Sequence, residues 1–149
     1  MMHWDPHRFS RVDLKKNLLS DEGVKILMQQ IAASKSIVDL NLASNEITNE
    51  GMCAIFKGLT ENQSVISLDV STIDGVSRNR MSAPSIEMLR QLLEYNNFIQ
   101  DLNLSSTGLG NAGLDAICEV LQKGAQKASS HKLLSKPASF LNLDLEDNT

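Results

Sequence analysis

The amino-acid sequence predicts an α/β solenoid, in which about four and a half units of one short strand and one helix stack along a single axis. Two repeated patterns of apolar residues support this prediction, because one has the spacing of a strand and the other the spacing of a helix. The two patterns alternate along the chain. Strands that alternate with helices are typical of a parallel sheet, so we expect a concave parallel sheet with the helices on its convex side.

The strand pattern is a triplet of apolar residues, in which the first two are separated by two residues and the last two by one. It occurs five times, and units are expected to start near residues 9, 37, 65, 99 and 140. The middle residues of successive triplets lie 28, 28, 34 and 41 residues apart. The last two intervals therefore contain insertions, which we place at about 73–80 and 123–139. The five triplets are Phe9/Val12/Leu14, Ile37/Leu40/Leu42, Val65/Leu68/Val70, Ile99/Leu102/Leu104 and Phe140/Leu143/Leu145.

The helix pattern consists of four residues spaced by four, which lie on one slowly drifting stripe of an α-helix. It follows each of the first four triplets, and its second position is glycine or serine in every copy. A small residue at this position allows the start of the helix to lie close to the sheet. The four copies are Leu19/Gly23/Leu27/Ile31, Ile47/Gly51/Ile55/Leu59, Met81/Ser85/Leu89/Leu93 and Leu109/Gly113/Ile117/Leu121.

Together, these patterns resemble the ribonuclease-inhibitor class of leucine-rich repeats over residues 9–149. That class includes the repeat domains of Ran GTPase-activating proteins, NOD-like receptors and tropomodulins. The resemblance implies a horseshoe segment with strands on the concave side and helices on the convex side. It does not distinguish among these proteins.

The resemblance also implies a role for asparagines that lie five residues after the middle of a triplet, where the chain turns away from the strand. Asn17, Asn45 and Asn148 occupy this position. The side-chain amide both donates and accepts hydrogen bonds, so it can bind the backbone of a neighbouring unit. Ile73 and Thr107 stand at the same position in the third and fourth units, and we expect the asparagine ladder to be interrupted there.

The patterns predict a single leucine-rich repeat domain over residues 1–149, with residues 1–10 as its amino-terminal cap. The last triplet is followed by Asn148 and Thr149 and by no further helix pattern. An apolar edge would then be uncovered at the carboxyl-terminal end. We therefore expect that the chain is truncated there relative to a longer protein, or that another chain covers this edge, including a second copy.

The composition is that of an ordinary globular protein, with 42% hydrophobic and 21% charged residues. The formal net charge of −4 disfavours binding to nucleic acid. No apolar run approaches the length of a membrane span, and the first residues lack the layout of a signal peptide. Two cysteines are too few for a disulfide framework. These features predict a cytoplasmic protein without nucleic-acid or membrane partners.

Polar residues that alternate with the apolar ones along each strand are expected to point away from the helices, onto the concave face of the sheet. They form three columns, in which six carboxylates outnumber the cations of Arg11 and Lys15. An acidic face favours a partner protein with a basic surface. The alternative is that these residues only keep an exposed sheet hydrated. The candidate binding residues are Asp13, Asp39, Asn41, Asp69, Asp101, Asn103, Asp144 and Glu146.

The two insertions are further candidate binding elements, because loops on a rigid scaffold often carry its function. The first insertion contributes Arg78 and Arg80, and the second contributes Lys127, His131 and Lys132. The second insertion is rich in lysine and serine, so the alternative is that it is a plain solvated loop.

The sequence does not predict an enzyme, a cofactor or a metal site. Residues 108–113 match the dinucleotide-binding pattern G-x-G-x-x-G, but Leu109 and Gly113 are helix-pattern positions, and no acidic strand end follows about 20 residues later. His3, Asp5 and His7 lack a fourth ligand for a structural zinc ion. The repeat geometry places no histidine beside a serine or cysteine nucleophile.

These observations predict a protein-interaction scaffold that binds its partner through the concave face and the inserted loops. The resemblance leaves three alternatives open. They are a regulator of a small GTPase, a cytoskeletal component of the tropomodulin or axonemal kind, and the sensing region of an immune receptor.

Overall fold

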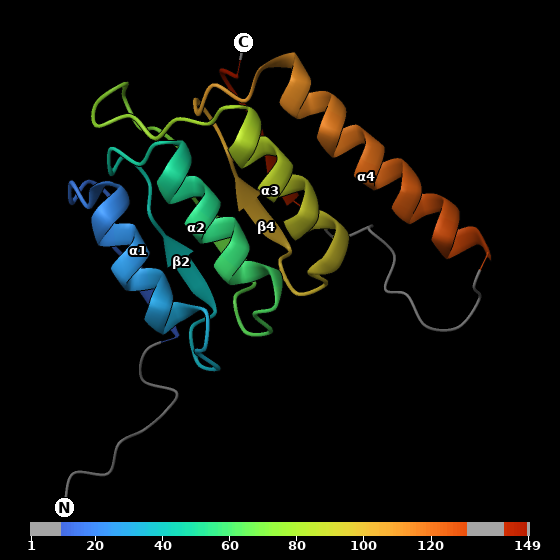
Figure 1. Cartoon of the computed structure of the whole chain (residues 1–149), viewed down its shortest axis with the longest axis horizontal. Coiled ribbons are helices and arrows are strands. Elements are labelled where there is room, and N and C mark those ends of the chain that lie inside the picture. Colours follow the sequence, from blue (N-terminus) through green and yellow to red (C-terminus); the bar gives the residue numbers. More distant parts are fainter. Residues whose placement is uncertain (1–9, 131–141, 149) are drawn as a thin grey trace, which may run out of the picture.

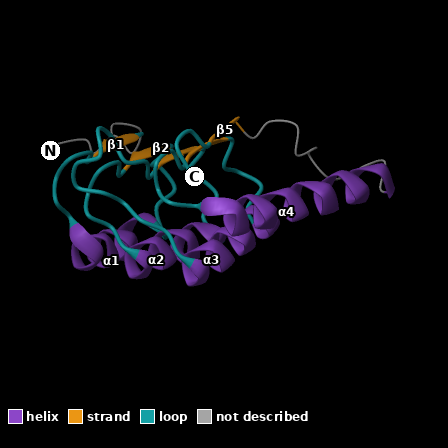
Figure 2. Cartoon of the chain, turned by 90° about the horizontal axis from the view of Figure 1, so that it is seen from above, coloured by secondary structure: helices purple, strands orange, loops and turns teal. Residues whose placement is uncertain are grey.

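The computed structural model describes residues 10–130 and 142–148, which form two layers (Figure 1). Strands and helices alternate along the chain, and the strands lie in one layer with the helices in the other (Figure 2). The fold is therefore the α/β solenoid that the two apolar patterns predict. The elements are β1 (Arg11–Asp13), α1 (Ser20–Ile31), β2 (Asp39–Asn41), α2 (Asn49–Thr60), β3 (Ser67–Asp69), α3 (Ala83–Tyr95), β4 (Asp101–Asn103), α4 (Gly110–Ser130) and β5 (Asn142–Asp144).

The five strands form one parallel sheet in the order β1-β2-β3-β4-β5. Each strand pairs with the next one in the chain, and equivalent residues lie side by side in every pair. The middle residues of the triplets therefore form one row, which consists of Val12, Leu40, Leu68, Leu102 and Leu143.

A single apolar core lies between the sheet and the helices. Leu40, Leu68 and Leu102 belong to the same cluster and are at most 2% exposed. Val12 and Leu143, at the two ends of the row, are only partly buried. Burial therefore depends on a neighbouring unit on each side, as expected for a solenoid.

At Gly51, steric crowding explains why the second position of the helix pattern is a small residue. A Cβ atom there would lie 2.5 Å from Oδ1 of Asp21 and 2.6 Å from Cγ2 of Ile47. Asp21 lies on α1, and its Oδ1 atom accepts hydrogen bonds from the backbone N–H groups of Thr48 (2.7 Å) and Gly51 (3.0 Å). The carboxylate of one helix therefore caps the amino terminus of the next helix.

An asparagine ladder joins the turns that follow the strands. Oδ1 of Asn45 accepts hydrogen bonds from the backbone N–H groups of Asn17 (2.9 Å) and Leu19 (3.3 Å). Its Nδ2 atom donates to the carbonyl groups of Leu14 (2.9 Å) and Ala43 (3.1 Å). One buried side chain thus satisfies the backbone of two neighbouring units.

Asn79 continues this ladder in the third unit. Its Oδ1 atom accepts hydrogen bonds from the backbone of Asn45 (2.9 Å) and Ile47 (3.0 Å), and its Nδ2 atom donates to the carbonyl of Leu42 (2.9 Å). The prediction of an interruption at Ile73 is therefore wrong. The insertion lies before the ladder position, so it moves the asparagine from position 73 to position 79.

The ladder is interrupted at Thr107, as the sequence predicts. The backbone N–H of Asn79 donates instead to Oγ1 of Thr72 (3.0 Å), and that of Met81 donates to the carbonyl of Thr107 (2.8 Å). The ladder resumes at Asn148, whose Oδ1 atom accepts a hydrogen bond from the backbone N–H of Thr107 (3.0 Å).

A second asparagine ladder, which the sequence analysis missed, lies at the opposite edge, where each helix leads into the next strand. Nδ2 of Asn62 donates to the carbonyl of Ile31 (3.1 Å), and its Oδ1 atom accepts from the N–H of Val65 (2.8 Å). Asn96 repeats the arrangement one unit later and donates to the carbonyl of Leu59 (2.7 Å). At both edges of the solenoid, buried or half-buried amide side chains therefore hydrogen-bond the backbone of neighbouring units.

The second insertion is not a loop throughout, because residues 123–130 continue α4. The composition explains this difference, since lysine, glutamine and alanine favour helix and only Gly124 opposes it. Lys127 therefore lies on a helix, whereas His131 and Lys132 lie outside the described residues. Figure 1 shows α4 extending past the other helices. Within the described ranges, no helix combines the length and the apolar character that a membrane span requires.

Candidate protein-binding surface

The register of the sheet determines which polar residues meet on the concave face. One column consists of Arg11, Asp39, Ser67, Asp101 and Asn142, and the middle column consists of Asp13, Asn41, Asp69, Asn103 and Asp144. These are the two columns that the alternation of residues predicts. The structure therefore brings seven of the eight candidate residues together on paired strand positions, and Glu146 follows the last strand.

Residues of the middle column also have a structural role. In each, Oδ1 accepts a hydrogen bond from the backbone N–H two residues later, at distances of 2.9–3.3 Å. Aspartate and asparagine make this bond equally well, and it initiates the turn away from the strand. The turn thus explains why an Asx residue stands at all five positions. It does not explain why Asp13, Asp69 and Asp144 carry a charge.

In the first part of the concave face, the carboxylates are paired with cations. Nε of Arg11 lies 3.4 Å from a carboxylate oxygen of Asp39, and its Nη2 atom lies 3.9 Å from Asp13. Nζ of Lys15 lies 3.8 Å from Asp13. We call these four residues of β1 and β2 the paired half. Two cations and two carboxylates leave it without net charge.

In the second part of the concave face, four carboxylates carry no cation. Asp69, Asp101, Asp144 and Glu146 make no ion pair with any residue in the described part of the chain. Asp101 accepts a hydrogen bond from Nδ2 of Asn142 (3.1 Å), which is neutral. We call these four carboxylates on and beside β3, β4 and β5 the acidic half.

The acidic half borders an open hollow in the sheet. Its lining comes from three neighbouring strands. The polar side chains of these strands face the hollow, whereas the side chains of Leu68 and Leu102 are buried in the core on the other side of the sheet. The lining residues are Ser67, Leu68, Asp69, Asp101, Leu102, Asn103, Asn142, Leu143 and Asp144. The hollow is therefore a concave and mainly polar surface, with Asp69, Asp101 and Asp144 among its lining residues.

The third predicted column consists of Lys15, Ala43, Ser71, Ser105 and Glu146. Only part of it is on the surface. Lys15 and Glu146 are exposed, but Ala43 is fully buried and Ser71 is 4% exposed. Ala43 and Ser71 are therefore not available to a partner, although the alternation of residues places them in this column. Beside them, the backbone N–H of Ile73 donates to Oγ of Ser44 (2.7 Å), which holds residues 73–80 over the turn of the second unit.

The other candidate residues that the structure describes lie away from the concave face. Arg78 and Arg80 are exposed in the loop between β3 and α3, at the edge where the strands end. Lys127 is on α4, on the helical side of the molecule. The structure thus separates the basic candidate residues that it describes from the acidic half.

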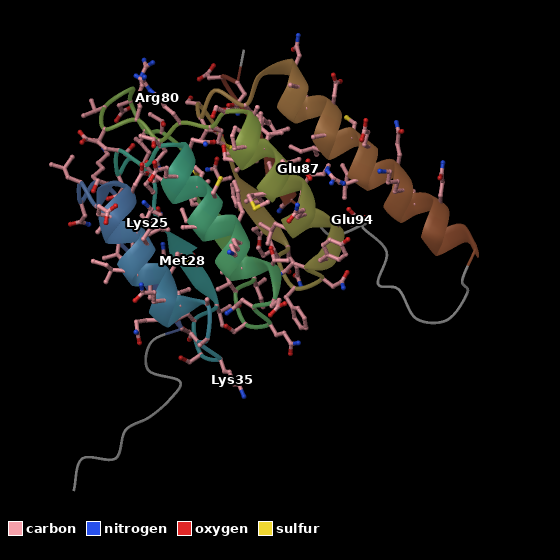
Figure 3. The ribbon with its side chains drawn as sticks, viewed as in Figure 1. Lys25, Met28, Lys35, Arg80, Glu87 and Glu94 are labelled. Atoms are coloured by element: carbon pink, nitrogen blue, oxygen red, sulfur yellow. The ribbon has the colours of Figure 1, made fainter. Side chains whose placement is uncertain are left out.

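Two clusters of charge on the convex side are paired, in contrast to the charges of the acidic half. Lys25 of α1 lies 2.7 Å from Glu50 of α2 and 3.2 Å from Glu22, and hydrogen bonds to these carboxylates raise the pKa of Lys25. On α3, Arg90 lies 2.6 Å from Glu87 and holds the pKa of Glu87 at about 2. Figure 3 shows Lys25, Glu87 and Glu94 on these helices. Exposed ion pairs of this kind contribute little to stability.

Neither the cysteines nor the acidic residues form a reactive centre in the described parts of the chain. Burial raises the pKa of the Cys53 thiol, and Glu50 raises it further, so the reactive thiolate is disfavoured. Cys118 is exposed on α4. Within these parts, no three histidine, cysteine or acidic side chains are grouped as a metal ion requires. The motif at His3, Asp5 and His7 lies outside the described residues.

Comparison with known proteins agrees with this architecture. The sequence matches the family described as Leucine Rich repeat at residues 33–56 and 95–118. It is 28% identical to ribonuclease inhibitor from Mus musculus over 106 residues, which are 70% of this chain and 22% of that protein. The chain is a ribonuclease-inhibitor-like leucine-rich repeat protein. Proteins built from such repeats are typically protein-interaction modules.

Two further relatives of this leucine-rich repeat protein are larger proteins. The chain is 24% identical over 137 residues to NACHT, LRR and PYD domains-containing protein 13 from Homo sapiens, covering 76% of this chain and 13% of that protein. It is 29% identical over 116 residues to leucine-rich repeat-containing protein 45 from Gallus gallus, covering 77% of this chain and 17% of that protein. The chain thus spans about a fifth or less of the curated relatives that it matches.

The same fold occurs in a solved structure, the tropomodulin C-terminal domain of Caenorhabditis elegans. The two structures superpose with a TM-score of 0.68 at 16% sequence identity, over 96% of this chain and 77% of the other. This likeness concerns the solenoid architecture alone.

Proposed function

We propose that the leucine-rich repeat protein binds a partner protein through the acidic half of its concave face, and that the partner contributes a basic segment. The observation that carries the proposal is the unequal pairing of charge along one regular sheet. Arg11 and Lys15 neutralise the carboxylates of β1 and β2, whereas Asp69, Asp101 and Asp144 make no ion pair with any of residues 10–130 and 142–148.

The hydration of an exposed sheet does not account for this distribution. Asparagine and serine hydrate a sheet without charge, and both residues stand at equivalent positions of the same columns. Carboxylates without a counter-ion favour encounter with a basic surface, and they affect the rate of association more than the final affinity. The described columns contain no tryptophan or tyrosine, which are the usual anchors of a tight interface. We therefore expect a salt-sensitive complex of moderate affinity.

Two double variants test the proposal, because they change net charge equally but at different places. Asp101→Asn/Asp144→Asn removes two charges from the acidic half. Asp13→Asn/Asp39→Asn removes two charges from the same columns of the paired half. Asparagine retains the acceptor for the turn at both middle-column positions, so folding should be preserved.

Each variant is used as bait for affinity capture from the source cells, followed by association kinetics with the captured protein at several salt concentrations. The expected result is that Asp101→Asn/Asp144→Asn slows association about tenfold at low salt and flattens its salt dependence, whereas the control variant does neither. Equal effects of the two variants would contradict a site in the acidic half. The GTPase-regulator, cytoskeletal and immune-receptor alternatives, and the cytoplasmic location, stay predictions from the sequence.

A further inference from the structure

Residues 73–80, which we call the insertion loop, are anchored to the first two units of the solenoid. The N–H of Ile73 donates to Oγ of Ser44 (2.7 Å), and the carbonyl of Ser77 accepts a hydrogen bond from the N–H of Glu46 (3.1 Å). Asp74 forms an ion pair with Lys16 of the first unit (3.6 Å). The loop therefore extends from β3 towards the first unit.

Asn79 fixes the base of the insertion loop. Its side chain is fully buried and occupies the ladder position, so the extra residues are accommodated without breaking the stack at this point. The next residue, Arg80, donates its backbone N–H to the carbonyl of Ile47 (2.8 Å). A loop held at both ends and in its middle presents its exposed side chains with little loss of conformational entropy on binding.

The exposed side chains of the insertion loop are basic and apolar. Val76 is 65% exposed. Arg78 and Arg80 make no ion pair in the described part of the chain, and Arg78 bonds only to the carbonyl of Gly75 (3.2 Å). Arg80 extends away from the body of the molecule (Figure 3). Because Lys16 pairs with Asp74, the exposed Val76 is followed by two arginines that make no ion pair with a described residue.

The described part of the molecule thus carries two surfaces of opposite sign whose charges are not paired within that part. The acidic half lies on β3, β4 and β5, and the insertion loop is held over the first and second units, in the opposite direction along the solenoid. The anchors at Ser44, Glu46 and Lys16 prevent the loop from turning back onto the acidic half of its own chain. A second copy has no such constraint.

We propose that the insertion loop of one molecule docks into the acidic half of a second copy, with Arg78 and Arg80 against Asp101 and Asp144. The contact joins two different surfaces, so it is heterologous and leaves a free loop and a free hollow at the ends of the pair. One short loop buries much less than the area of a stable interface, so the association is weak and depends on salt.

This inference shares the acidic half with the proposed function but does not require it. A second copy that occupies the hollow competes with the basic partner. Self-association and partner capture therefore respond differently to changes in the loop, which the partner does not touch. Variants of the loop separate the two proposals.

Sedimentation velocity over a range of protein concentrations, at low and at high ionic strength, tests the proposal. We expect the wild-type chain to show a sedimentation coefficient that rises with concentration at low ionic strength only. Arg78→Glu/Arg80→Glu should weaken self-association at least about tenfold. The control Lys35→Glu/Lys57→Glu changes net charge equally on exposed lysines outside the loop, and it should leave self-association unchanged.

A charge exchange makes the test specific to these two surfaces. Asp101→Arg/Asp144→Arg should also be monomeric alone, and an equimolar mixture with Arg78→Glu/Arg80→Glu should associate again, because the acidic loop then meets a basic hollow. Circular dichroism checks that each variant is folded. A monomeric wild type at low ionic strength would overturn the proposal, and so would a mixture that does not associate. In either case, unchanged partner capture by Arg78→Glu/Arg80→Glu leaves the proposed function standing.

Discussion

The first two units and the last two units of the solenoid have the same backbone but different side-chain environments. In the first two, the concave-face charges are paired, and the ladder is continuous from Asn45 of the second unit to Asn79 of the third. In the last two, the carboxylates are unpaired, the ladder is interrupted at Thr107, and Leu143 is only partly buried. Regular strands and helices therefore do not make the units equivalent.

This difference indicates a division of roles within one repeated architecture. The first units satisfy their polar groups internally and support the insertion loop on the same ladder. The last units keep charge and apolar surface available on the sheet. Interactions that are satisfied within the protein stabilise it, whereas those left open are available to a partner. Four measurements test this contrast between the first and the last units, and the first measurement has the largest expected effect.

Asn79→Ala should lower the free energy of unfolding by about 3 kcal/mol, because buried backbone groups of two units lose their partner. The groups include the N–H of Asn45 and of Ile47 and the carbonyl of Leu42. Asn17→Ala is the matched control, since Asn17 is exposed and should cost less than about 0.5 kcal/mol. Urea denaturation measures both variants. Equal losses would show that the buried hydrogen bonds of Asn79 do not stabilise the protein.

Gly51→Ala should cost about 2 kcal/mol, because the new methyl group would collide with Asp21 and Ile47. The control is Gly58→Ala on the same helix, where a Cβ atom would meet the flexible end of Met28 at 2.8 Å. That contact can relax, and alanine favours helix over glycine by up to about 1 kcal/mol, so a change near zero is expected. Thermal unfolding distinguishes the two variants. A stable Gly51→Ala protein would mean that α1 and α2 can move apart.

Amide hydrogen exchange compares the two parts of the molecule directly. The N–H of Leu42 donates to the carbonyl of Asp69 at 2.8 Å, and the N–H of Leu104 donates to that of Asp144 at 2.9 Å. These equivalent bonds differ in their surroundings, because the unit of Leu104 packs against the half-buried end of the sheet. We expect the opening free energy at Leu104 to be lower by about 1 kcal/mol. Identical protection would contradict the contrast between the two parts.

The fourth measurement, which has the smallest expected effect, concerns the pKa of Glu87. This residue lies on α3, where the two parts meet. Hydrogen bonds from Arg90, and then from Gln91, lower the pKa of Glu87 to about 2. A lowered folded-state pKa adds stability that is present above the unfolded value of about 4.5 and is lost as the pH falls towards 2. An NMR titration of the carboxyl carbon should give this low midpoint, and Arg90→Gln should return it towards 4.5. A normal midpoint in the wild type would show that the ion pair is not maintained in solution.

Most of the architecture was predictable from residue spacing alone. The triplets and the helix patterns identified every strand and the start of every helix stripe, because apolar side chains must face one core at a period set by the backbone. Two further features carried a signal that the sequence analysis did not use. Asn79 lies six residues after Ile73, which is the length of the insertion, and Asn62 and Asn96 each lie six residues before the middle of the next triplet.

The end of α4 and the pairing of charges were not predictable in the same way. The helix continues to Ser130 beyond its last apolar position, where local propensity rather than packing extends it. Arg11 and Asp39 are far apart in the sequence and meet only because their strands are adjacent and in register. The burial of Ala43 and Ser71 likewise depends on neighbouring turns.

The periodic placement of apolar residues is enough to predict the repeat unit, the parallel sheet and the polar columns of the concave face. Contacts between units determine which carboxylates are neutralised, how the insertion loop is anchored and which residues of the third column are covered. The two groups of features differ in the range over which the interactions act. Periodicity acts between residues a few positions apart, whereas ion pairs and ladder bonds join side chains that the stacking of units brings together.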